Sequence, residues 1–296
     1  MNELRPTLLK NIIGQSRVVE CLQISIQAAK QKNKALPHVL LYGPPGLGKT
    51  TIATAIANEM GADIQIANGG GCRQPKFILP YITKSSANSI LFIDEIHRIS
   101  SEVEELLYPV MEDFRLDLSG EEYSESIDLE EFTIIGATTD SGQLSSPFRD
   151  RFAIKHSLET YAEKDIATIL RINSNKFALD CDEQAIQDIA RRSRGTPRVA
   201  NNLLSWVKDF SLAKNISQIN SSTIKTSMNL IGIDDRGLNE QDRRYLDTLR
   251  RTGKPVGLST LVSSLNIARE TVTEQIEPFL LQQNLIVKTA KGRVLA

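Results

Sequence analysis

The segment that most constrains this chain is Gly-Pro-Pro-Gly-Leu-Gly-Lys-Thr-Thr at residues 43–51. It matches the phosphate-binding loop pattern, in which a glycine, four residues and a second glycine precede lysine and a hydroxyl residue. Residues 38–42 before it are apolar enough for a buried strand, and residues 51–60 after it read as a helix that ends at Gly61. A glycine- and proline-rich turn that merely opens a helix would not require this register. The segment therefore predicts a strand, a phosphate-binding loop and a helix.

The residue types of this loop fit the binding of phosphate groups. Glycines allow the loop to approach an anion closely with its backbone N–H groups pointing inward. The N-terminus of the following helix adds partial positive charge. Lys49 would reach the β- and γ-phosphates, and the Thr50 hydroxyl would bind Mg²⁺. The residues assigned to nucleotide binding here are Gly43, Gly46, Leu47, Gly48, Lys49, Thr50 and Thr51.

Composition excludes several other classes of protein. The chain has 296 residues, 41% hydrophobic and 24% charged, which is typical of a soluble globular protein with two or three domains. No segment is long and apolar enough for a membrane span, and the N-terminus lacks a signal-peptide core. The three cysteines are scattered, so we expect no disulfide framework and a cytoplasmic location. A net charge of −1 gives no overall argument for nucleic acid, so any such binding requires a local patch.

The first part of the chain alternates strands with helices, which indicates a parallel α/β sheet. Residues 89–94 and 132–137 contain continuous apolar runs, as in strands that are buried on both faces. A further strand is expected at 63–67, and helices are expected at 15–30 and 102–111. We place this P-loop domain at residues 1–154.

After Phe152 the expected strands disappear and helices take their place. Four helices are expected at 162–173, 183–194, 197–214 and 221–230. They predict a small helical domain at 155–235. Three helices and two short strands then follow in the order of a winged-helix domain, which we place at 236–296. These last elements are expected at 242–251, 258–265, 269–283, 285–287 and 294–295.

Two carboxylates, Asp94 and Glu95, end the apolar strand at 89–94. Ligands of a nucleotide-binding sheet collect at the C-terminal ends of the strands. Asp94 would then face the Mg²⁺ that Thr50 binds, and Glu95 could accept a proton from the attacking water as a general base. Solvated acids at a strand end are common, but the upstream phosphate loop favours the catalytic interpretation.

Three further positions carry side chains suited to a nucleotide site. Thr139 follows the strand at 132–137 and could orient the attacking water, although a simple threonine-rich turn explains the pattern nearly as well. Arg151 lies where the sheet domain ends and could reach the γ-phosphate held by a neighbouring subunit. Arg198 starts a helix of the second domain and could project back onto the nucleotide. Arginines in a polar turn are otherwise usually solvated.

The run of motifs resembles that of AAA+ ATPases, and most closely that of the RuvB family, bacterial motors of Holliday junction branch migration. The most specific match is Asp-Glu-Ile-His-Arg at 94–98, followed by Tyr-Pro at 108–109 and Met-Glu-Asp-Phe at 111–114. The matching segments span nearly the whole chain, at residues 4–6, 13–15, 38–51, 91–98, 107–109, 111–114, 136–139, 146–147, 149–152, 192–198, 242–246, 255–258 and 282–283.

This resemblance implies ATP and Mg²⁺ as cofactors and gives roles to residues that the patterns alone do not assign. The nucleotide pocket would include Leu4, Arg5, Ile13, Tyr161, Pro197 and Arg198, the last in sensor 2. The hydrolytic residues would be the Walker B acids Asp94 and Glu95, Thr139 in sensor 1 and the arginine finger Arg151. The segment that approaches the neighbour's nucleotide would be Glu112, Asp113 and Phe114. The wing would contact DNA through Lys288, Lys291 and Arg293.

Two features depart from the family pattern. Ile12 stands where an aromatic residue is expected, which alters the packing near the adenine. The segment that forms the hairpin for docking on RuvA, the junction-binding partner, is short, and residues 117–131 contain seven acids and no lysine or arginine. Such a surface would face away from DNA phosphates, with Tyr123 as the expected anchor for a partner. A solvated hairpin without a partner explains the segment about as well.

We therefore expect an ATP-hydrolysing homohexameric ring that drives Holliday junction branch migration in recombination, DNA repair and the SOS response, with a RuvA-like partner. Phosphate contacts would dominate its binding to duplex DNA. Residues 237–296 support this with nine lysines and arginines against six acids, a net charge of +3. A clamp-loader-like ATPase would instead carry a helical collar as its third domain. An ATP-dependent assembly switch without motor activity would not require Glu95 and Arg151.

Overall fold

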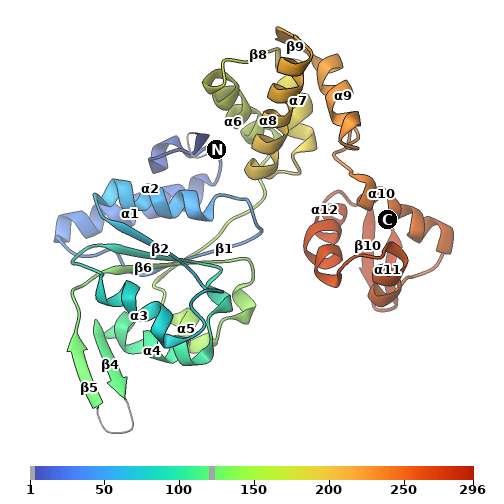
Figure 1. Cartoon of the computed structure of the whole chain (residues 1–296). Coiled ribbons are helices and arrows are strands. Elements are labelled where there is room, and N and C mark those ends of the chain that lie inside the picture. Colours follow the sequence, from blue (N-terminus) through green and yellow to red (C-terminus); the bar gives the residue numbers. More distant parts are fainter. Residues whose placement is uncertain (1–3, 120–123) are drawn as a thin grey trace. The chain divides into compact units, whose positions relative to one another are not determined.

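The computed structural model describes residues 4–119 and 124–296, and the chain divides into two compact units, residues 1–165 and 166–296 (Figure 1). The first unit contains a five-stranded sheet in the order β2-β3-β6-β1-β7, and every strand pair in it is parallel. The strands are β1 (Val39–Tyr42), β2 (Ile64–Asn68), β3 (Ile90–Asp94), β6 (Thr133–Thr138) and β7 (Ile154–Ser157).

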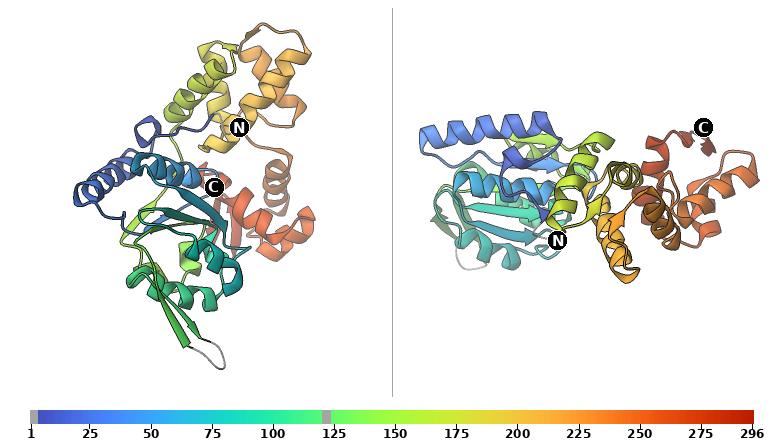
Figure 2. Two further views of the ribbon diagram at one scale, coloured as in Figure 1. Left: turned by 60° about the vertical axis from the view of Figure 1, so that its left-hand side comes forward. Right: turned by 90° about the horizontal axis from the view of Figure 1, so that it is seen from above.

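Helices cover both faces of this sheet, with α1 and α2 on one side and α3, α4 and α5 on the other (Figure 1 and Figure 2). These helices are α1 (Ser16–Lys32), α2 (Lys49–Met60), α3 (Pro75–Thr83), α4 (Ser101–Glu112) and α5 (Ser146–Asp150). Short 3₁₀ turns lie at Leu9–Asn11, Ile96–Arg98 and Ser141–Gln143. The central strands β3 and β6 are buried on both faces, which explains their continuous apolar sequences.

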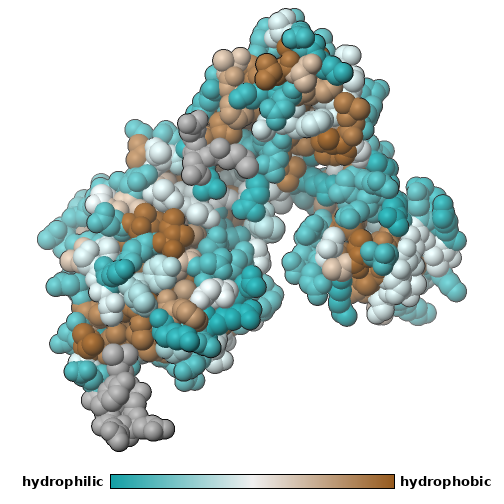
Figure 3. All heavy atoms as spheres, in the orientation of Figure 1, coloured by the Kyte–Doolittle hydropathy of each residue, from teal (hydrophilic) through white to brown (hydrophobic). Residues whose placement is uncertain are grey.

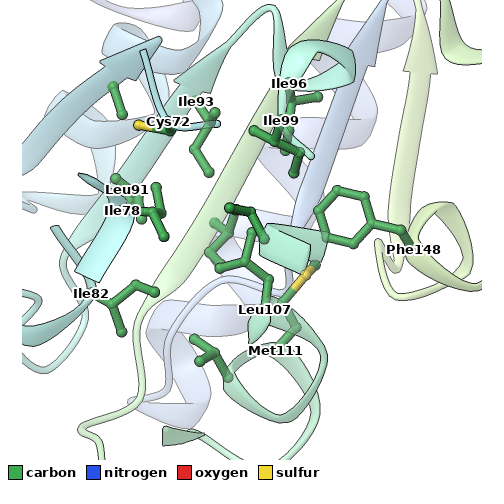
Figure 4. Packing of buried hydrophobic residues seen from close by; sticks show 14 of the residues in the cluster. Cys72, Ile78, Ile82, Leu91, Ile93, Ile96, Ile99, Leu107, Met111 and Phe148 are labelled. Atoms are coloured by element: carbon green, nitrogen blue, oxygen red, sulfur yellow. The ribbon is translucent and has the colours of Figure 1, made fainter. Parts of the chain in front are cut away.

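The core below the sheet joins residues that are far apart in sequence. Leu91 and Ile93 of β3 pack with Ile78 of α3 and with Leu107 and Phe148 of α4 and α5, all in one buried cluster (Figure 4). Each side chain has almost no exposed surface, and burying one stabilises the fold by roughly 1.5–3 kcal/mol. This packing fixes the loops at the strand ends against a rigid support.

A hairpin extends the first unit beyond its sheet. It pairs β4 (Arg115–Ser119) with β5 (Ser124–Asp128) in antiparallel register. Leu116 is buried in the core and the partly buried Leu129 packs against the same core, so both contribute to packing within the first unit. Ile127 is 39% exposed. Tyr123, the expected anchor, lies outside the described residues.

The second unit contains the helical lid and the winged helix. The lid consists of α6 (Glu163–Lys176), in which the boundary between the units falls, α7 (Glu183–Arg192), α8 (Pro197–Ala213) and α9 (Ser221–Leu230). The winged helix consists of α10 (Glu240–Thr252), α11 (Leu258–Leu265), a π-helical segment at Thr271–Ile276, α12 (Glu277–Gln282) and the antiparallel strands β10 (Ile286–Thr289) and β11 (Gly292–Leu295).

Polar contacts join the lid to the winged helix. Arg194, in the loop between α7 and α8, donates to the Asp242 carboxylate at 2.5 Å, and its guanidinium lies 4.3 Å from the centre of the Phe279 ring. Asp242 also closes a capping box with Asn239 at the start of α10. The N-terminus of α10 is thereby tied to the lid.

The structure corrects three expectations. Strands do not disappear after Phe152: β7 forms the fifth strand of the sheet, so the sheet extends past the expected boundary at 154, and β8 (Asp180–Cys181) pairs with β9 (Gln218–Ile219) in the lid. Helix α3 was not expected. The helix expected at 269–283 contains the π-helical segment, which gives way to α12 at Glu277.

Candidate nucleotide-binding site

The phosphate-binding loop connects the C-terminal end of β1 to α2, as its sequence predicts. Gly43 has φ 135°, and a Cβ atom at this position would lie 2.4 Å from the Leu158 carbonyl oxygen, so only glycine fits. Lys49 is buried, and its ammonium group donates to the carbonyl oxygens of Gly43 at 2.7 Å and Pro44 at 3.1 Å. The loop is thus curled around the lysine that would meet the phosphates.

The acidic end of β3 lies at the same end of the strands as the phosphate-binding loop, which we call one edge of the sheet. All five strands run parallel, and β6, which lies between β1 and β3, pairs with both of them. Asp94 ends β3, and its carboxylate accepts from the Glu95 N–H at 3.0 Å. The Thr50 hydroxyl and the Asp94 carboxylate belong to this edge, and both are oxygen donors of the kind that Mg²⁺ prefers. Their binding of the ion stays a prediction.

No group of three or more His, Cys, Asp and Glu that could hold a metal ion occurs among the described residues. The Thr50 hydroxyl and the Asp94 carboxylate alone fit Mg²⁺ in a nucleotide site, because that ion is usually bound by one or two protein groups together with phosphates and waters. The residues present therefore suit a metal that arrives with the nucleotide.

Glu95 and Thr139 come together at this edge. The Thr139 hydroxyl donates to Glu95 Oε2 at 3.3 Å. The backbone of Glu95 has φ 50°, the left-handed region that costs a non-glycine residue roughly 1–3 kcal/mol. Such strain concentrates at functional sites, which agrees with the catalytic interpretation of Glu95.

Tyr161, one of the expected pocket residues, contacts the phosphate-binding loop and lies beside Gly14. The Tyr161 hydroxyl donates to the Leu47 carbonyl oxygen at 3.2 Å, and a Cβ on Gly14 would lie 2.8 Å from the Tyr161 ring. Burial raises the pKa of Tyr161 to about 12, so its phenol stays protonated. Leu4 is buried, whereas Arg5 is exposed and Ile13 is half-buried. Tyr161 thus links the phosphate loop to the N-terminal segment.

Pro197 and Arg198 belong to the second unit. Pro197 is the first residue of α8, where proline is tolerated, and Arg198 follows it with an exposed side chain. Their contact with nucleotide stays a prediction.

The expected arginine finger, Arg151, lies at the opposite end of the strands from the phosphate-binding loop. Arg151 precedes β7, and β7 is parallel to β1, so Arg151 lies where the strands begin and the phosphate loop lies where they end. Four strand residues separate these edges by roughly 13 Å. Arg151 therefore does not belong to the site formed by its own phosphate loop.

The end of α4 shares this second edge. His38, just before β1, contacts the Met111 carbonyl oxygen at 3.1 Å through Nε2. The Arg151 guanidinium forms an ion pair with Glu112 at 3.2 Å and lies 3.9 Å from the centre of the Tyr108 ring. Glu112 is thus brought to Arg151, and the expected approach of Glu112, Asp113 and Phe114 to a neighbour's nucleotide stays a prediction.

The wing places its three expected DNA contacts in different surroundings. Lys288 and Arg293 each bind the carboxylate of Glu277 at 2.7 Å, and Glu277 is fully buried. Lys291 is exposed in the turn between β10 and β11. The contacts of all three with DNA stay predictions, but Arg293 also has a structural role.

Sequence reasoning missed Glu277 as a partner of these cations. The only sequence signal for this role is that Glu277 lies beside Ile276, Phe279 and Leu280, apolar residues at helical spacing. All three are buried.

The site combines a glycine-rich loop around Lys49, acids at the same end of the strands and Arg151 at the opposite end. This combination defines a P-loop ATPase of the AAA+ class. Family models agree over almost the whole chain: the Holliday junction DNA helicase RuvB P-loop domain matches residues 4–158, the RuvB AAA lid domain 161–234 and the RuvB C-terminal winged helix domain 235–296. The chain belongs to the RuvB family.

Individual relatives are similar over most of their length. The Holliday junction branch migration complex subunit RuvB of Rhodopirellula baltica is 46% identical over 98% of this chain and 81% of its own length. The protein of the same name from Campylobacter hominis is 44% identical over 99% of this chain and 87% of its own length. The structure of the Thermotoga maritima RuvB Holliday junction branch migration motor has a TM-score of 0.89 and 40% identity, over 99% of this chain and 95% of that one.

Proposed function

We propose that this chain is the ATP-hydrolysing motor subunit of a homohexameric ring that drives Holliday junction branch migration in recombination and DNA repair. The ring would work in the cytoplasm and cooperate with a RuvA-like junction-binding protein. The observation that carries this proposal is the placement of the phosphate loop and Arg151 at opposite edges of one sheet. A complete site then requires two subunits.

The residues of one edge would hold the nucleotide. Lys49 would bind the β- and γ-phosphates, and Thr50 and Asp94 would hold Mg²⁺, which neutralises charge on the phosphate oxygens when bound. Leu4, Arg5, Ile13 and Tyr161 would line the nucleotide pocket beside the phosphate loop, and Pro197 and Arg198 would also contact the nucleotide.

Glu95 would act as the general base. It would take a proton from the attacking water, with Thr139 fixing its carboxylate. Arg151 of a neighbouring subunit would stabilise the charge that develops on the γ-phosphate, and Glu112, Asp113 and Phe114 of that subunit would approach the same nucleotide. Subunits would thereby hydrolyse ATP only when assembled.

Two further observations fit a ring on DNA. The lid carries large exposed apolar side chains, including Leu212 at 77% and Leu230 at 67%, and apolar atoms gather over the lid in Figure 3. Surfaces of this kind are often covered in assemblies. Residues 237–296 have a net charge of +3, which suits contacts with DNA phosphates through Lys288, Lys291 and Arg293.

The domain boundaries we propose are those expected from the sequence, except that the first domain extends to the end of β7: 1–157, 158–235 and 236–296. Within the described residues, no helix has the length and apolar character needed to cross a membrane. The clamp-loader-like alternative calls for a helical collar, whereas this chain carries a winged helix. The assembly-switch alternative is separated from a motor by single-turnover hydrolysis.

The test is branch migration of a synthetic four-way junction with ATP, in the presence and absence of the host's junction-binding protein. Glu95→Gln serves as the control, because it should bind ATP but barely hydrolyse it, while Lys49→Ala should weaken binding itself. Hydrolysis without any branch migration would exclude the motor. Hydrolysis by Glu95→Gln at the parent rate would exclude Glu95 as the base.

A further inference from the structure

His97 lies between the two polar groups that end neighbouring strands. It belongs to the short turn Ile96–Arg98 after β3, and its side chain is only 12% exposed. Its Nδ1 atom lies 2.9 Å from the Thr138 hydroxyl oxygen and 3.4 Å from Glu95 Oε2. One ring nitrogen therefore faces both the end of β6 and the candidate general base.

The hydrogen-bond pattern of Thr138 determines which atom carries the shared proton. The Thr138 hydroxyl donates its only proton to the Asp140 carbonyl oxygen at 3.0 Å, and its oxygen accepts from the Asp140 N–H at 3.0 Å. The remaining contact, with His97, must then be donated by the ring, because a hydroxyl has a single proton. This assignment makes His97 the Nδ1–H tautomer, which donates to Thr138, and Glu95 Oε2 lies 3.4 Å from the same nitrogen.

The backbone around Glu95 leaves little freedom for its side chain. Glu95 has φ 50°, the N–H of Gly69 donates to the Asp94 carbonyl oxygen at 2.7 Å, and a Cβ on Gly69 would lie 2.3 Å from the Glu95 carbonyl oxygen. Oε2 faces both His97 and Thr139. The other carboxylate oxygen is left to meet a water.

We propose that His97 is a positioning residue for ATP hydrolysis, which holds the Glu95 carboxylate against the end of β6 through its Nδ1–H. This rests on the proposed function, because it takes Glu95 as the general base. A base acts only within hydrogen-bond reach of the water, and general-base catalysis contributes roughly 10²–10⁴-fold. Loss of the His97 contact removes part of this factor without touching the nucleotide.

The test compares His97→Asn with His97→Gln in the full-length protein. The asparagine amide nitrogen stands as many bonds from the main chain as Nδ1, whereas the glutamine amide reaches the position of Nε2. We expect kcat of the glutamine variant to fall roughly tenfold or more below that of the asparagine variant. ATP binding and the melting temperature should be the same for both. A purely structural histidine would instead lower the melting temperature in step with kcat.

Two controls separate this inference from the proposed function. His156→Leu removes a histidine from β7 of the same sheet and should leave kcat within about threefold. His97→Leu added to Glu95→Gln should cost nothing further, because residues that act as a unit are not additive. Equal kcat for the asparagine and glutamine variants, with Glu95→Gln inactive, overturns the role of His97 alone. An active Glu95→Gln overturns the base assignment on which the role depends.

Discussion

Arg293→Ala is expected to destabilise the winged helix rather than to act on DNA alone. The buried carboxylate of Glu277 accepts from the Tyr245 hydroxyl at 3.0 Å, and from Arg293 and Lys288 at 2.7 Å each. Burial by itself would raise the pKa of Glu277, but the hydrogen bonds from Arg293 and Lys288 outweigh it and lower the pKa. Without Arg293, a fully buried carboxylate keeps only one cation, and that cation is about half exposed.

The cost follows from this geometry. Removing one partner of a buried ion pair destabilises a protein by roughly 3–5 kcal/mol. Because Lys288 and Tyr245 remain, the lower end applies, roughly 3 kcal/mol. At about 1.4 kcal/mol per tenfold, the open form of the winged helix should become roughly a hundredfold more populated.

Hydrogen–deuterium exchange of the full chain, read by mass spectrometry, measures this change where it occurs. The slowest amides of α12 and β10 should exchange roughly a hundredfold faster in Arg293→Ala. Lys291→Ala is the matched control: exposed substitutions usually change stability by less than about 0.5 kcal/mol, while loss of its phosphate contact should reduce the log–log salt slope of DNA binding by about 0.9. Parent-like exchange in Arg293→Ala, together with a reduced salt slope, would refute the structural role.

Three further outcomes are expected. Arg151→Ala subunits mixed with Lys49→Ala subunits should regain hydrolysis at mixed interfaces, because trans arginines are worth roughly 10³–10⁵ in rate; no recovery in rings shown to be mixed would count against a shared site. Gly69→Ala should lower kcat and spare ATP affinity, because its Cβ would lie 2.3 Å from the carbonyl oxygen of Glu95, the proposed base. Gly71→Ala, whose Cβ would meet only a 3.4 Å contact, should keep the parent kcat, and equal kcat values for the two variants would contradict this. Burial lowers the pKa of His38 from its ordinary 6.5 to about 4, so the unfolded chain binds more protons than the folded chain between these pH values. The free energy of unfolding, measured with urea, should therefore fall by up to roughly 3 kcal/mol as the pH drops through this window. If the dependence of this free energy on pH is the same in His38→Leu, His38 is not its cause.

The parts of the fold that the sequence predicts well are those with a strong local pattern. The phosphate loop requires a fixed order of glycines, lysine and threonine, and β3 is a run of apolar residues that ends in acids. Helix α3 carries no comparable signal, because it has nine residues, follows three glycines and includes Pro80. Strand β7 has only four residues and lies at the sheet edge, so its alternation is too short to read.

In the candidate site, too, the residues that could be predicted are those with a strong local pattern. Lys49 and Asp94 follow from local sequence, since each stands next to a strand whose end places it. The role of Glu277 could not be predicted, because its partners lie 11 and 16 residues away and only the folded wing brings them together. For Arg151, its position and the resemblance suggested a role in trans, which stays a prediction; the parallel direction of β1 and β7 separates Arg151 from its own phosphate loop.

The opposed positions of the phosphate loop and Arg151 have a genetic consequence. In a ring built as proposed, a chain with Arg151→Ala keeps its own nucleotide and spoils the site of an intact neighbour. A cell that makes both forms would then lose more activity than the share of altered chains, so the allele would be dominant. A chain too damaged to assemble would leave its neighbours intact and would be recessive.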